Sequence, residues 1–194
     1  MPAGKMKYQV LVVSSSDKIH DYITDLLPPN EYDRVIRVHD AGEARRNMLN
    51  SSADIVIINT PLPDEFGIDL ALDLSDGIAG VMLLVKNELR DQTCYKVEDS
   101  GVLTIGKPST KQIIYSGVKL LTAMTAKLAK MERKNKTLQE KMADIRTVNR
   151  AKWLLIENLN MTEKDAHYYI EKQAMDTRLS RREVAENIIR TYDK

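Results

Sequence analysis

Several short apolar runs in the first half of the chain end in side chains whose types bear on chemistry. Ser14 and Ser15 follow the first of these runs, Asn59 ends a later one and Val85 ends the next. Lys107 follows the last run and precedes a proline. If these runs are parallel strands, their carboxyl ends meet at one edge of a sheet, and the residues share a site. Hydroxyl and amide groups carry no negative charge, so this site lacks the carboxylates that Mg²⁺ binding and phosphoryl transfer require. We expect structural hydrogen bonding there, with Lys107 contacting Asn59.

The remaining reactive side chains indicate neither catalysis nor metal binding. His20, His39 and His167 have no metal-ligand spacing with one another. Cys94 is the single cysteine, and only Lys96 lies near it to favour the reactive thiolate, so we expect a packed residue rather than a redox sensor. The chain has no glycine-rich phosphate loop and no nucleophile–base motif. We therefore predict no enzymatic activity, no cofactor and no metal.

The elements that would position the strand-end residues alternate between strand and helix. Apolar runs of strand length are followed by amphipathic stretches of helical period, which is the pattern of a parallel sheet covered by helices. Asp17 and Asp40 stand where they would cap the first two helices. The pattern predicts an α/β fold, a five-stranded doubly wound (flavodoxin-like) domain over residues 1–118. The expected strands are 8–13, 34–38, 54–59, 80–85 and 102–105, and the expected helices are 17–27, 41–50, 68–75 and 91–100.

Residues 119–149 are predicted to form one long helix with an apolar seam. Apolar residues recur at alternating spacings of three and four, which is a heptad repeat with a and d positions. Asn135 falls at an a position, where a buried asparagine fixes the register of parallel two-stranded coiled coils. We expect a coiled-coil homodimer; the alternative is a single amphipathic helix lying on its own domain. The seam consists of Leu121, Met124, Leu128, Met131, Asn135, Leu138, Met142 and Ile145.

The last third of the chain, residues 141–194, contains two further short helices with clear start signals. Thr162 begins a motif similar to a capping box, and Ser180 with Glu183 makes a full one. Apolar residues follow each start at helical spacing, so these helices and the end of the long helix are predicted to form a three-helix module. Such a module is too small to hold a deep catalytic pocket, and we expect it to bind rather than catalyse.

The first domain resembles the receiver domain of bacterial response regulators. That family has an acidic pair after the first strand, an acceptor aspartate after the third, a Ser or Thr after the fourth and Lys-Pro after the fifth. Here Ser14-Ser15 replaces the acidic pair, Asn59 the acceptor and Val85 the hydroxyl residue, while Lys107-Pro108 is retained. The resemblance implies a degenerate receiver, or pseudo-receiver, without aspartyl phosphorylation. A regulatory protein, a small ligand or oligomerisation would then supply the input.

The three-helix module resembles the ANTAR domain, the antitermination module of amidase and nitrate regulators. The matching residues include Ala151-Lys152, Glu163 with Ala166, Ala174-Met175 and Val184-Ala185. The resemblance implies a dimeric, RNA-binding transcription antiterminator that holds paired hairpins in a nascent leader transcript. Unpaired RNA bases are bound by stacking and by basic contacts to phosphate. The residues expected to contact RNA are Arg150, Lys152, Lys164, His167, Tyr168, Arg178, Arg181 and Arg182.

The overall composition is that of an ordinary soluble protein. Apolar residues make up 43% and charged residues 29%, and the net charge is +1 at pH 7, so any basic surface must be local. The first dozen residues contain only a short apolar run, which favours a cytoplasmic protein without membrane contact. Two alternatives to RNA binding stay open: a DNA-binding transcription factor and an adaptor that binds no nucleic acid. The DNA alternative is weakened because the connections between the last helices contain no glycine.

Overall fold

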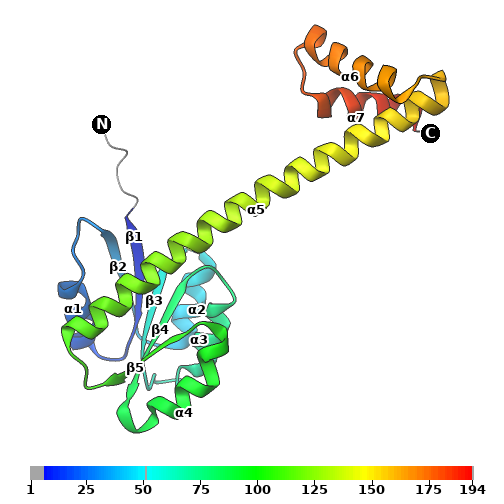
Figure 1. The fold of residues 1–194 in the computed structure, drawn as a ribbon. Coiled ribbons are helices and arrows are strands. Elements are labelled where there is room, and N and C mark those ends of the chain that lie inside the picture. The colour runs from blue at the N-terminus through cyan, green and yellow to red at the C-terminus, as the bar shows by residue number, and fades with distance from the viewer. Residues whose placement is uncertain (1–6, 51, 194) are drawn as a thin grey trace. The chain divides into compact units, whose positions relative to one another are not determined.

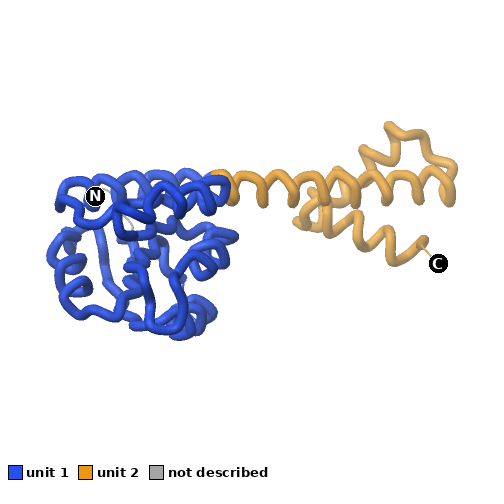
Figure 2. The backbone as a smooth tube through the Cα atoms, turned by 90° about the horizontal axis from the view of Figure 1, so that it is seen from below, with its two compact units in different colours: residues 1–130 blue, residues 131–194 orange. Residues whose placement is uncertain are grey.

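The computed structural model describes residues 7–50 and 52–193, and the chain divides into two compact units, residues 1–130 and 131–194 (Figure 2). One helix, α5 (Lys111–Leu159), is continuous through the boundary between them. No proline or glycine interrupts it after Gly117, which is consistent with its length of 49 residues. No helix in the described part of the chain is long and apolar enough to cross a membrane.

The first unit is a parallel sheet with helices on both faces (Figure 1). Its five strands have the order β2-β1-β3-β4-β5, and every neighbouring pair is parallel. This arrangement confirms the predicted doubly wound α/β class. The strands are β1 (Tyr8–Val13), β2 (Tyr32–Val38), β3 (Ile55–Asn59), β4 (Gly80–Lys86) and β5 (Leu103–Lys107). The helices are α1 (Asp17–Leu26), α2 (Ala41–Asn50), α3 (Ile68–Ser75), α4 (Asn87–Val97) and the short 3₁₀ turn η1 (Glu98–Ser100), with α5 following β5.

Two separate cores cover the two faces of the sheet, because successive side chains of a strand point to opposite sides. On one face, Val56 and Ile58 of β3 pack in a cluster that also includes Leu70 of α3. On the other face, Ile55 and Ile57 pack in a cluster that includes residues of α1 and α5. The central strands are therefore apolar nearly throughout, as buried parallel strands are expected to be.

The long helix begins at Lys111 rather than at residue 119, and its first turns belong to this domain. Ile114, Val118 and Leu121 are buried against the sheet. A Cβ on Gly117 would lie 2.8 Å from the Cε of Met82, so glycine permits the close approach of helix and strand. Leu121, expected to begin the dimer seam, is instead 2% exposed in the domain's own core.

Two other expectations about element starts are corrected. The helix after β4 begins at Asn87 rather than at residue 91. The apolar pattern did not reveal this start, because only Thr93 and Val97 of α4 are buried and its first turns are exposed. Asp17 is the first residue of α1, and the cap position is occupied by Ser16 without a side-chain cap bond. Asp40 does cap α2, since its Oδ1 accepts the backbone N–H of Glu43 at 2.7 Å.

The second unit consists of the end of α5 with α6 (Glu163–Thr177) and α7 (Arg181–Tyr192). The Thr162 hydroxyl oxygen accepts the backbone N–H of Asp165, and Ser180 with Glu183 forms both bonds of a capping box. Small and branched apolar side chains fill the space between the three helices. This core consists of Ala151, Leu155, Ala166, Ile170, Val184, Ala185 and Ile188.

Replacing Ser180 by Ala removes both bonds that its hydroxyl makes at the start of α7. We expect amide hydrogen exchange in α7 to become faster by about fivefold, because a lost amino-terminal cap destabilises its helix. Hydrogen exchange monitored by mass spectrometry checks this, with Thr191→Ala in the last turn of the same helix as the control. Equal exchange in the Ser180→Ala and native proteins would contradict the assigned cap.

Candidate functional site

Three of the strand-end residues form one hydrogen-bonded network. The Nζ of Lys107 donates to Asn59 Oδ1 and to the carbonyl oxygen of Thr60, both at 2.6 Å. The Nδ2 of Asn59 donates to the Oγ of Ser14 at 3.0 Å. Burial, followed by the nearby charge of Lys86, lowers the pKa of Lys107. The network therefore surrounds a partly buried ammonium group with neutral acceptors.

The other two strand-end residues lie outside this network. Ser15 is exposed, and Val85 is fully buried within the apolar core. Asp64, in the loop after β3, also points elsewhere: its carboxylate accepts the backbone N–H groups of Ala41 and Gly42, each at 3.0 Å. These bonds at the start of α2 lower the pKa of Asp64. Among the described residues, no carboxylate is hydrogen-bonded to the Ser14–Asn59–Lys107 network.

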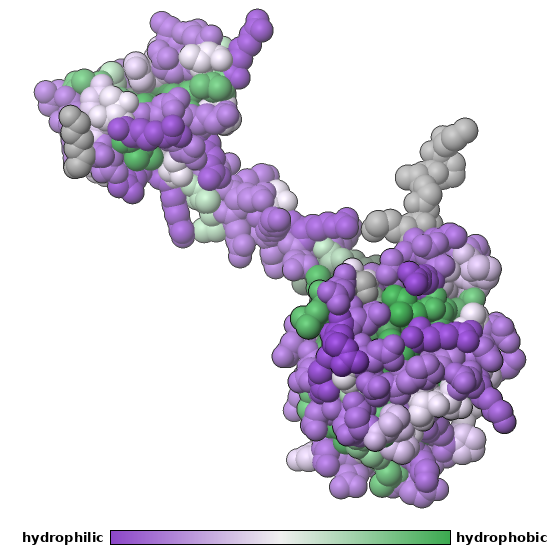
Figure 3. Space-filling model, turned by 180° about the vertical axis from the view of Figure 1, so that it is seen from behind, coloured by the Kyte–Doolittle hydropathy of each residue, from purple (hydrophilic) through white to green (hydrophobic). Residues whose placement is uncertain are grey.

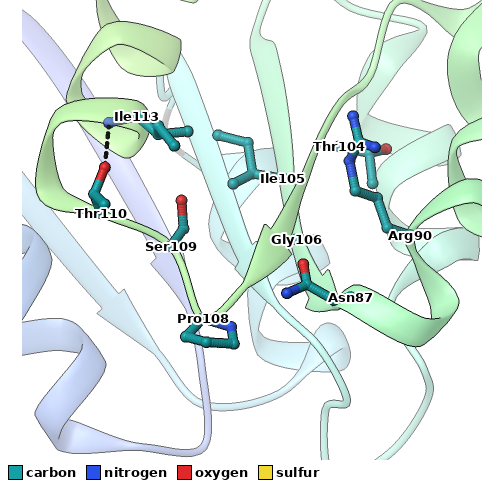
Figure 4. Close-up of a pocket in the computed structure, with 9 residues that line it drawn as sticks. All are labelled: Asn87, Arg90, Thr104, Ile105, Gly106, Pro108, Ser109, Thr110 and Ile113. Carbon is teal, nitrogen blue, oxygen red and sulfur yellow. Dashed lines mark hydrogen bonds between the residues drawn. The ribbon is translucent and has the colours of Figure 1, made fainter.

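An open pocket of about 670 Å³ lies between α4, β5 and the start of α5 (Figure 4). Asn87 and Arg90 come from α4, and Thr104 comes from β5. Arg90 is the one charged side chain among the residues that line it, and the others offer hydroxyl, amide or apolar groups. A single cation gives this pocket little means to bind a polyanion.

A larger groove lies within the second unit, along α5 and beside the start of α7; we name it the α5–α7 groove. It has a volume of about 800 Å³. It brings together four of the residues expected to contact RNA, namely Lys152, His167, Arg181 and Arg182. The remaining lining residues are Glu140, Lys141, Asp144, Ile145, Val148, Asn149 and Ser180.

Three cations of the groove, Lys152, Arg181 and Arg182, form ion pairs with neighbouring carboxylates. Lys152 contacts Glu163 at 3.1 Å, and Arg181 contacts Glu171 at 3.1 Å. Arg182 contacts Asp144 at 2.8 Å and also Glu186, and these two carboxylates raise its pKa. The guanidinium groups are thus held in place but partly neutralised. A phosphate would have to compete with the carboxylates for them.

The other four expected RNA contacts lie outside the groove. Arg150 forms an ion pair with Asp193, and Lys164 is exposed on α6. Arg178 follows α6 with left-handed backbone geometry, and Tyr168 is 63% exposed. Trp153 is also exposed, at 65%, so its ring is available for stacking instead of filling the module's core.

Lys141 and Asn149 also line the groove, although neither was among the RNA contacts expected from the sequence. They are eight residues apart, with Ile145 midway between them, so they share one face of the helix. That spacing was visible in the sequence, but the position of α7 against this face was not.

The middle of α5 is mainly hydrophilic, with paler apolar side chains between the charged ones (Figure 3). The apolar members of the expected seam beyond Leu121 remain largely uncovered in the single chain. Their exposed fractions are 45% for Met124, 48% for Leu128, 53% for Met131, 48% for Leu138, 56% for Met142 and 60% for Ile145.

Comparison with known families locates a match in the second unit. Residues 136–189 match the ANTAR domain, over the end of α5, α6 and most of α7. The chain carries an ANTAR domain. The α5–α7 groove therefore lies in this domain, because every residue that lines it falls within the matched range.

A curated relative covers nearly the whole chain. The transcriptional regulatory protein PdtaR of Mycobacterium tuberculosis is 28% identical over 185 residues, which is 94% of this chain and 90% of the relative. The alignment thus extends through the first unit as well as the ANTAR domain.

Solved structures are similar to the first unit in fold. The receiver domain of an HD domain-containing protein from Pseudomonas fluorescens has a TM-score of 0.58 at 18% identity, over 67% of this chain and 98% of that one. A CheY-like receiver domain protein from Methanospirillum hungatei has a TM-score of 0.57 at 18% identity, over 63% and 98%. The chain thus combines a receiver-like domain with an ANTAR domain.

Replacing Asn59 by Ala removes an acceptor from the ammonium group of Lys107, whereas Asp keeps the acceptor and adds a charge. We expect Asn59→Ala to destabilise the first unit by about 1–2 kcal/mol, and Asn59→Asp to be at least as stable as the native protein at pH 7. Hydrogen exchange of the β3 amides reports the stability of this unit alone. Equal losses in the two variants would show that the contact with Lys107 contributes nothing.

Proposed function

We propose that this protein is a transcription antitermination regulator whose ANTAR domain binds paired hairpins in nascent leader RNA. The observation that carries the proposal is the α5–α7 groove, which gathers lysine and arginine side chains from α5 and α7, with His167 of α6, within the matched ANTAR range. The relative PdtaR is a transcriptional regulatory protein, which supports the same class of function.

The chemistry of the ANTAR domain suits single-stranded RNA loops. Lysine and arginine contact phosphate, and exposed aromatic rings stack on unpaired bases. Trp153 and Tyr168 supply exposed rings, while Lys152, Arg181 and Arg182 supply the charges. Because the cations are paired with carboxylates, one domain is expected to bind weakly.

Dimerisation through α5 would compensate for weak binding by each domain. The exposed seam from Met124 to Ile145 follows a heptad repeat, and covering it by a second copy would bury its apolar surface. Two ANTAR domains in one dimer would then bind two hairpins of the same transcript, and the second contact would gain from the high effective concentration.

The residues at the carboxyl ends of the strands support regulation without aspartyl phosphorylation. Asn59 offers an amide where a receiver has its acceptor carboxylate, and Ser14-Ser15 offers no ligand charge for Mg²⁺. Lys107 is already hydrogen-bonded to Asn59 and Thr60. A different input, such as a bound ligand or a partner protein, is required at this domain.

The Arg181→Ala variant tests the groove as an RNA-binding surface. We expect its affinity for a two-hairpin leader RNA to fall by about tenfold, and the slope of log K against log salt to decrease by about one, because one phosphate contact is lost. Gel-shift titrations across a salt series measure both quantities. The matched control is Arg190→Ala, which removes an exposed cation from the same helix outside the groove.

Two results would contradict RNA binding through the groove. Equal affinity in the native and Arg181→Ala proteins would place the RNA elsewhere. Tighter binding of duplex DNA than of the hairpin RNA would favour a DNA-binding transcription factor, and binding of neither would favour an adaptor.

The Leu138→Glu variant tests the dimer. A carboxylate at this d position would be buried in the seam, so we expect a monomer in sedimentation equilibrium and a loss of the preference for two hairpins over one. Gln139→Glu, at the neighbouring exposed position, should remain a dimer. A native protein that sediments as a monomer, or a Leu138→Glu variant that stays dimeric, would overturn the assignment of the seam.

A further inference from the structure

Three potential metal ligands converge at the carboxyl ends of β1 and β2. Asp17 begins α1, His20 lies one turn later, and His39 directly follows β2. One ligand atom of each residue lies within 4.8 Å of the ligand atoms of the other two. The rings of His20 and His39 meet edge to face, with centroids 5.3 Å apart. Asp17 and His39 are exposed, whereas His20 is fully buried.

The hydrogen bonding of His20 leaves one nitrogen without a partner. Its Nε2 lies 2.9 Å from the carbonyl oxygen of Ser14, and because a carbonyl only accepts, Nε2 carries the hydrogen. In the neutral ring, Nδ1 then has a free lone pair. This buried atom has no hydrogen-bond partner among the residues that the structure describes. A metal-binding histidine commonly donates its other N–H to a backbone carbonyl in this way.

Neighbouring residues fix the backbone at His39 and pair the nearby cation. The backbone N–H of His39 donates to the carboxylate of Glu43 at 2.8 Å, which fixes the start of the loop. Arg37 is the neighbouring cation, and its charge is paired with Asp21 at 2.8 Å.

We propose that Asp17, His20 and His39 bind a divalent transition-metal ion, with Zn²⁺ as the representative. Two imidazole nitrogens and a carboxylate suit zinc and similar ions better than the oxygen-seeking Mg²⁺. Three protein ligands leave a fourth coordination position for water or a small molecule. The spacing of the histidines along the chain did not indicate this arrangement, because His39 reaches the site through the pairing of β2 with β1.

The proposed site is connected to the strand-end network through Ser14. The Ser14 carbonyl accepts from His20, and its Oγ accepts from Asn59, which in turn bonds Lys107. A metal ion on His20 would therefore order the end of β1 next to the residues that replace the phosphorylation site. Metal binding would give the receiver-like domain an input that needs no phosphate.

The test uses full-length protein without a histidine tag, freed of metal and titrated with Zn²⁺ alone in a calorimeter. We expect one ion per chain and a rise in the unfolding temperature of the native protein on adding Zn²⁺. His39→Ala removes an exposed ligand and should weaken binding by at least about tenfold, and Asp17→Asn should weaken it less. The controls are His167→Ala and Cys94→Ser, which remove the other histidine and the single thiol.

Titration with Co²⁺ adds a readout of the coordination itself, because its visible absorption reports nitrogen and oxygen ligands. Circular dichroism confirms that the His39→Ala variant is folded. Absence of stoichiometric binding to the native protein, or equal affinity in the native and His39→Ala proteins, would overturn the proposal. Loss of binding in His167→Ala or Cys94→Ser would overturn it as well, by placing the ion elsewhere.

Discussion

Burial of both faces of the parallel sheet is the constraint on which the first unit depends. Each central strand must be apolar on both sides, so polar groups are confined to the strand ends. That confinement brings Ser14, Asn59 and Lys107 together at one edge and sets His20 beside His39 at the same edge. Polar replacements at this edge can therefore leave the fold intact, whereas Val85 of β4 is part of the apolar core itself.

The ANTAR domain combines a small apolar core with many surface ion pairs. Its core is small, and its surface cations are engaged in ion pairs that connect α5, α6 and α7. Exposed ion pairs of this kind stabilise a fold only weakly, but they limit the conformations of long side chains. An external anion that bound this surface would have to displace these internal carboxylates from the cations.

Strong local patterns made much of the structure predictable. Continuous apolar runs identified the strands, and Ser180 with Glu183 identified the start of α7. α4 was misplaced at its beginning, because its exposed first turns carry no apolar period. The role of Leu121 was also missed, since a heptad position does not reveal which surface covers it. The proximity of His20 and His39 depends on strand order, which spacing along the chain does not encode.

The apolar stripe of α5 packs against the sheet in its first turns and is exposed beyond them. Ile114, Val118 and Leu121 face the sheet, and Leu128 continues the same stripe one heptad after Leu121. Because an α-helix turns by about 100° per residue, the side on which a residue lies depends on how many residues separate it from Leu121. A single-residue insertion after Leu121 would turn the exposed apolar residues away from the side of α5 that packs on the sheet. A seven-residue insertion would return them nearly to the same side. The length of α5 therefore sets which side of the helix the exposed apolar residues occupy. Changes in length by whole heptads alter that side least.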